Sequence, residues 1–77
     1  MHTYANEKWI ELYYAVLVER RQVRIRARVQ AARIEIAERL ITLKGVTDSS
    51  EERGAIKAAL NALSIVERQV HKPFYVD

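Results

Sequence analysis

Apolar residues recur at helical spacing along most of this 77-residue chain. Neither glycine nor proline occurs before Gly45, and every residue from Asn6 to Leu43 except Asn6 itself is compatible with a helix interior. Lys44 and Gly45 are typical of a helix end, as a terminal cation and a following glycine. The pattern therefore predicts one long helix over about residues 6–43, with Asn6 as its N-cap.

A second helix is predicted over about residues 50–71. Ser49 and Glu52 have the spacing of a capping box at its start, and Pro73 ends it. The sequence thus predicts an all-α fold, a single domain of residues 1–77 in which two helices of unequal length form an antiparallel hairpin. The shorter helix has one conventional packing stripe: Ile56, Ala59, Leu60, Leu63, Val66 and Val70.

The stretch VRIRARV, residues 23–29, alternates apolar and basic residues and fits either a strand or a helix. A strand would align Arg24, Arg26 and Arg28 on one face, but no turn residue flanks the run and no second run could pair with it. We therefore favour a helix, which carries two apolar stripes on nearly opposite sides. One stripe is Val23, Ala27, Ile34, Ala37 and Ile41, and the other is Ile25, Val29, Ala32, Ile36 and Leu43.

A helix that is apolar on two sides needs two partners, and the shorter helix can cover only one side of residues 23–43. The N-terminal half of the long helix is left uncovered, although it is the most apolar part of the chain. We therefore expect a homodimeric helical bundle, with a tetramer or an unknown protein partner as alternatives. The residues expected at the oligomer interface are Trp9, Leu12, Tyr13, Val16, Leu17, Val18, Ile25, Val29 and Ile36.

A different outcome is a break near residues 19–22, which would let the chain fold on itself as a three-helix monomer. No glycine, proline or cluster of turn residues marks such a loop. The continuous helix is therefore the prediction, and the three-helix monomer is the alternative.

The net charge of +3 is concentrated in one segment: residues 20–34 hold six arginines and no acidic residue. Arg21, Arg24 and Arg28 share one flank of the predicted helix and form a candidate anion-binding site. Phosphate contacts there would make the protein a non-specific nucleic-acid binder. We favour a solubilising flank whose arginines pair with acids such as Glu35 and Glu38, because helical geometry places Arg26 and Arg33 on the other flank.

The remaining composition argues against catalysis, metals and membranes. Without cysteine the chain has no disulfide and no thiolate zinc site, and neither His2 nor His71 is spaced with carboxylates as a metal-ligand set. The longest apolar run, residues 12–18, is too short to span a membrane, and the first 20 residues lack the features of a secretory signal. We expect a cytoplasmic, non-enzymatic oligomerisation or protein–protein interaction module that has no cofactor and no membrane partner.

Overall fold

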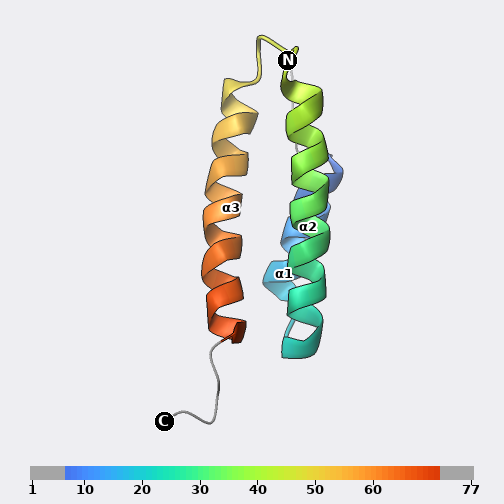
Figure 1. Ribbon diagram of the computed structural model, residues 1–77, viewed down its shortest axis with the longest axis vertical. Helices are drawn as coiled ribbons and strands as arrows, with labels where there is room; N and C mark the ends of the chain where they lie inside the picture. The colour runs from blue at the N-terminus through green and yellow to red at the C-terminus, as the bar shows by residue number, and fades with distance from the viewer. Residues whose placement is uncertain (1–6, 72–77) are drawn as a thin grey trace.

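The computed structural model describes residues 7–71 of the chain, and these residues form three α-helices and no strand (Figure 1). The helices are α1 (Lys8–Val18), α2 (Gln22–Leu43) and α3 (Ser50–His71). The all-α prediction is confirmed, and α3 has the bounds expected from the sequence. Residues 1–6 and 72–77 lie outside the described residues. They include His2, the predicted N-cap Asn6 and both ends of the predicted domain.

Residues 19–21 interrupt the long helix that the sequence predicts over residues 6–43. The backbone is extended at Glu19 (φ −78°, ψ 132°) and again at Arg21 (φ −88°, ψ 120°), and α2 starts at the next residue. The continuous helix is therefore wrong. The alternative, a break near residues 19–22 that lets the chain fold on itself, is the structure observed.

The side chain of Glu19 stabilises this break without glycine or proline. One carboxylate oxygen, Oε2, accepts the backbone N–H of Arg21 at 3.0 Å. The other, Oε1, lies 2.7 Å from Nε of Arg28, nearly two turns into α2. Because the first N–H groups of a helix have no partner within the helix, an acceptor placed just before it favours a helix start there.

The three helices run alternately up and down, with α2 in the middle of the chain order and in contact with both of the others. Glu19 at the end of α1 pairs with Arg28 near the start of α2, whereas Trp9 at the start of α1 lies near Arg39 and Glu52 at the opposite end. In Figure 1, α1 lies behind α2 and α3 lies beside it. The return of α1 along α2 buries Trp9 and Val16 and partly buries Leu12 and Tyr13, which a continuous helix would have exposed.

One apolar core is shared by all three helices. From α2 it takes the stripe of residues 25–43, in which Val29, Ala32, Ile36 and Leu43 are buried and Ile25 is partly buried. The stripe predicted on α3 also packs inward. The buried apolar residues contributed by α1 and α3 are Trp9, Val16, Ile56, Ala59 and Leu63.

Arg53 in the first turns of α3 holds the connection between α2 and α3. Its Nη2 donates to the carbonyl of Leu43 at 2.8 Å, and its Nε donates to Oγ of Ser49 at 2.9 Å. Ser49 in turn donates to the carbonyl of Val46 at 3.1 Å. α2 ends where the sequence predicts, but Gly45 does not have a positive φ. The carbonyl of Leu43 is instead satisfied by the backbone N–H of Val46 at 3.0 Å together with the guanidinium of Arg53.

Candidate functional site

The face of α2 that points away from the core carries an uncovered apolar stripe, which we call the outer stripe. It comprises the first of the two stripes predicted from the sequence. Val23 is 83% exposed, Ile34 58% and Ile41 67%, and the alanines between them are exposed as well. At 1.5 Å per residue, the stripe extends for roughly 27 Å along the helix. Its members are Val23, Ala27, Ile34, Ala37 and Ile41.

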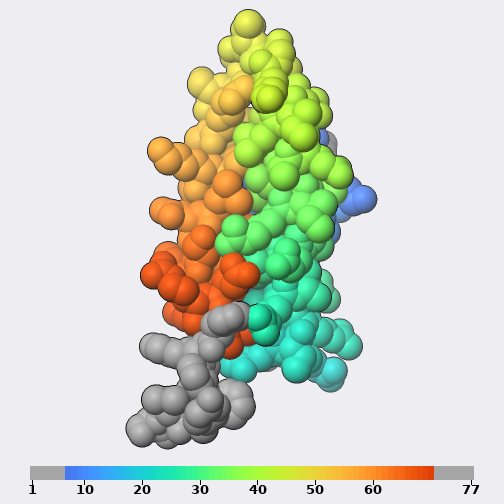
Figure 2. Space-filling model, viewed as in Figure 1, coloured from blue at the N-terminus to red at the C-terminus, as the bar shows by residue number. Residues whose placement is uncertain are grey.

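The fold itself explains why this stripe is uncovered. α1 packs behind α2, and α3 packs beside it (Figure 1). Both helices pack against the other stripe of α2, over residues 25–43, which we call the inner stripe. The space-filling view shows the side chains of α2 reaching the surface along the front of the molecule (Figure 2). Of the two apolar sides of this helix, the chain covers only one.

The outer stripe has the spacing of a helix-pairing seam. Together with Gln30, which is also exposed, its residues occupy positions 23, 27, 30, 34, 37 and 41, in alternating steps of four and three. Apolar residues in such steps form the contact line of two helices that wind around each other, and a single polar residue within the line is a common specificity device. The outer stripe therefore has the pattern of a surface that pairs with another helix.

The residues that the sequence predicts at an oligomer interface do not lie on the outer stripe. Trp9, Val16, Val29 and Ile36 are buried within the chain itself, so an uncovered half-helix no longer requires a partner for them. Ile25, Leu12 and Tyr13 are partly buried against the same core. Leu17 and Val18 remain exposed, at the end of α1.

A buried polar cluster joins the three helices at the end of the molecule opposite Glu19. Glu52 of α3 is only 2% exposed, and its carboxylate accepts Nε and Nη2 of Arg39 at 2.7 and 2.8 Å. Its Oε2 also accepts the indole N–H of Trp9 at 2.9 Å. Hydrogen bonding to Glu52 is the main reason why the pKa of Arg39 lies above its ordinary value. Glu7 adds a longer ion pair to Arg39, at 3.5 Å.

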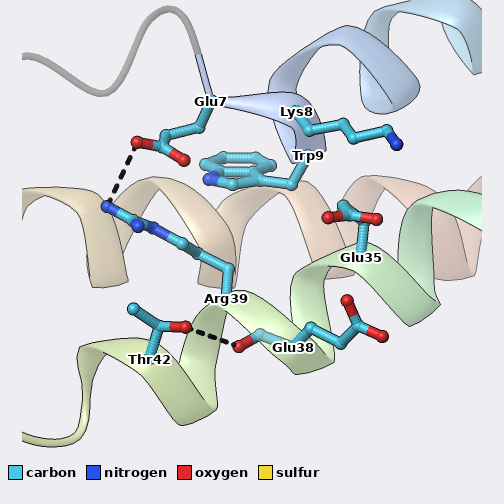
Figure 3. Close-up of a pocket in the computed structure, with 7 residues that line it drawn as sticks. All are labelled: Glu7, Lys8, Trp9, Glu35, Glu38, Arg39 and Thr42. Carbon is cyan, nitrogen blue, oxygen red and sulfur yellow. Dashed lines mark hydrogen bonds and ion pairs between the residues drawn. The ribbon is translucent and has the colours of Figure 1, made fainter.

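A hollow of about 170 Å³ lies beside this cluster (Figure 3). Its wall combines the start of α1 with the second half of α2. The guanidinium of Arg39 and the indole of Trp9 are both held by Glu52. We therefore assign the hollow no catalytic role and treat the cluster as a structural tie. The hollow is lined by Glu7, Lys8, Trp9, Glu35, Glu38, Arg39 and Thr42.

The arginines proposed as an anion-binding site surround a carboxylate of the chain itself. Arg28 pairs with Glu19, Arg21 donates its backbone N–H to the same carboxylate, and Arg24 contributes its charge from further away. These interactions, led by the N–H of Arg21, hold the pKa of Glu19 below the ordinary 4.5. The side chains of Arg21 and Arg24 are exposed, whereas Arg28 is already neutralised.

Arg33, on the other flank, is also engaged. Its Nη2 donates to Oε1 of Glu67 at 2.9 Å and to Oγ of Ser64 at 3.3 Å, both on α3. The positive segment seen in the sequence is thus partly neutralised by Glu19, in the turn after α1, and by Glu67 of α3.

Sequence reasoning identified the outer stripe but did not place the interface on it. The alternating steps of four and three were the available signal. Among residues 7–71, no helix has the length and apolar character needed to cross a bilayer, and no group of three metal-ligating side chains comes together. Comparison with protein-family models, curated proteins and solved structures found no match for this chain.

Proposed function

We propose that this protein is a small, non-enzymatic helical interaction module that forms a homodimer through the outer stripe of α2. In this arrangement two copies of α2 lie at the centre of a helical bundle, each backed by its own α1 and α3. The cytoplasmic location predicted from the sequence is part of the same proposal, and the lack of cysteine is compatible with it.

The observation that carries the proposal is the exposure of Val23, Ile34 and Ile41 along one line of a 22-residue helix. Scattered apolar residues are ordinary on a protein surface, but an apolar line with helix-pairing spacing, interrupted by the single polar residue Gln30, is not. Burying each of these large side chains contributes on the order of 1 kcal/mol or more to association. A two-fold dimer buries the three side chains of both subunits.

Self-association also suits the size of the chain. Nine apolar residues are buried in the part of the chain that the structure describes, and a chain of 77 residues is in the size range in which folded domains are marginally stable. Dimerisation is one of the usual ways in which such small domains gain stability, and this chain has no cysteine for a disulfide.

We do not propose nucleic-acid binding as the function. Two of the six arginines in residues 20–34, Arg28 and Arg33, are paired with acids of the same chain. The other four, Arg20, Arg21, Arg24 and Arg26, are exposed, but no aromatic residues are interleaved with them for base stacking.

The test compares two isoleucine substitutions by size-exclusion chromatography with light scattering. Ile34→Glu places a charge in the outer stripe and should increase the dissociation constant of the dimer by about 100-fold or more. Ile65→Glu is the matched control, because Ile65 is 49% exposed and lies on the side of α3 opposite the buried Ile56 and Leu63.

A dimer that survives Ile34→Glu would overturn the proposed surface. A dimer that is lost equally in both variants would also do so. Circular dichroism of each variant establishes that the helices are retained.

A further inference from the structure

We infer that two copies of α2 pair antiparallel, at a register that brings Arg24 of one copy beside Glu38 of the partner subunit. This inference rests on the proposed function, because it specifies the orientation and register of the same dimer. It is carried by three features of α2: the order of side-chain sizes in the outer stripe, the charges that flank it, and the distribution of charge along the helix.

The side-chain sizes along the seam, which is the outer stripe together with Gln30, are nearly symmetric about the level of Ala32: they follow a similar order towards both ends of α2. Val23 and Ile41 lie nine residues before and after Ala32, Ala27 and Ala37 lie five residues away, and Gln30 and Ile34 lie two residues away. In an antiparallel pair centred there, Val23 faces the partner subunit's Ile41 and Ala27 faces the partner subunit's Ala37. Large residues then meet large ones and small residues meet small ones, which keeps the helix separation even along the seam.

The charges beside the seam complement each other in this register. Arg24 follows Val23 and Glu38 follows Ala37, so both lie on the same flank of the outer stripe. In the antiparallel pair each Arg24 comes beside the partner subunit's Glu38, and the two-fold axis produces this pair twice. Both side chains are exposed, and neither forms an ion pair with another described residue of its own chain.

The distribution of charge along α2 favours the same orientation. Its first two turns carry three arginines without an acid, whereas in its second half the acids Glu35 and Glu38 balance Arg33 and Arg39. A parallel pair would bring the two arginine-rich halves together, and their like charges would repel. An antiparallel pair separates them, and it also sets the two helix dipoles in opposite directions.

The other flank of the seam is compatible with this arrangement. Arg33 lies near the two-fold axis and faces its own copy there, but its charge is matched by Glu67 of the same chain at 2.9 Å. In a parallel pair the neighbour of Glu38 would be the partner subunit's Arg33, which already donates to Glu67 and Ser64. The antiparallel pair gives Glu38 a partner that has no such bonds.

Cysteine cross-linking tests the orientation directly, since the chain has no cysteine of its own. Ala27→Cys and Ala37→Cys chains are mixed, one of them with a cleavable tag that identifies it by mass, and oxidised at a concentration at which the unmodified chain is dimeric. A disulfide needs Cα atoms about 4.4–6.8 Å apart, so only cysteines in the same layer of the seam can form one. Lys57→Cys, exposed on α3, is the control for random collision.

The antiparallel pair predicts a mixed disulfide between Ala27→Cys and Ala37→Cys chains, and no more covalent dimer from Ala27→Cys alone than from Lys57→Cys. Self-linking of Ala27→Cys would establish a parallel pair and overturn this inference while leaving the proposed dimer intact. A monomeric unmodified chain would instead remove the proposed function itself.

Charge reversal tests the predicted ion pair independently. Arg24→Glu and Glu38→Arg, made singly, each place like charges together twice per dimer and should raise the dissociation constant roughly tenfold at low salt. The double variant exchanges the two charges and should restore the affinity. Additive losses in the double variant would contradict the pairing.

Discussion

The indole Nε1 of Trp9 donates a hydrogen bond to Oε2 of Glu52 at 2.9 Å, and this bond joins the first helix to the third across 43 positions of sequence. Arg39 of α2 donates to both oxygens of the same carboxylate. One buried acid therefore connects all three helices.

Glu52→Ala should lower the free energy of unfolding by about 3 kcal/mol, because it leaves the guanidinium of Arg39 and the N–H of Trp9 without their shared acceptor. Glu51→Ala is the matched control: Glu51 is the exposed neighbour in the same helical turn, and its loss should change stability by no more than about 0.5 kcal/mol. Urea unfolding followed by circular dichroism measures both. Equal stability of the two variants would contradict the structural role of Glu52.

The turn between α1 and α2 should respond to acid through Glu19. The pKa of Glu19 is lowered in the folded chain, first by the N–H of Arg21 and then by the charges of Arg28 and Arg24. Its stabilising effect is therefore complete above the ordinary value of 4.5 and is lost as the pH falls through the lower, folded pKa. Glu19→Gln has no such carboxylate, so the stability difference between it and the unmodified chain should shrink from about pH 6 to about pH 3.

Urea titrations of the two proteins at several pH values measure this difference. Arg28→Gln provides a graded control: it removes one charge but keeps the N–H of Arg21, so it should weaken the pH dependence without abolishing it. A stability difference between Glu19→Gln and the unmodified chain that stays constant over this range would contradict the role of Glu19.

Trp9 is the chain's only tryptophan, and its fluorescence reports whether α1 is covered by its own chain. The side chain is 2% exposed in the isolated subunit. In the Ile34→Glu variant, dissociated to monomers, Trp9 emission should therefore keep the short wavelength of the folded protein until urea unfolds it. A red shift that accompanies dissociation alone would mean that a second copy covers Trp9, as a continuous helix would require.

The sequence was sufficient for the parts of the fold that depend on local periodicity. The start of α3 near Ser50, the end of α2 at Leu43 and the presence of two apolar stripes on α2 all follow from apolar spacing and helix-end residues. These features are set by neighbours within a few turns of the same helix, so a single sequence contains the information.

The break at residues 19–21 could not be predicted from local periodicity. The segment contains no residue that disfavours a helix, and it is held by an ion pair between Glu19 and Arg28 and by the burial of Trp9 and Val16 after the reversal. Both depend on contacts between different helices. The same limit applies to Glu52, whose spacing from Ser49 indicates a helix cap but whose carboxylate also binds Arg39 and Trp9.

The break at residues 19–21 changes which residues are candidates for an interface with a second copy. A continuous helix would expose Trp9 and Val16 and make them the natural contacts of a second copy, whereas the observed reversal buries them. The outer stripe was recognisable from sequence as one of two apolar faces. Only the packing of α1 and α3 shows which of the two remains uncovered.

Sedimentation equilibrium of the unmodified chain, over a wide range of concentration, tests self-association most directly. The weight-average mass should rise from the 9.0 kDa of one chain towards twice that value and level off there. A mass that stays at 9.0 kDa up to the highest concentration would contradict the dimer, and a mass that rises well beyond two chains would contradict a single closed interface on α2.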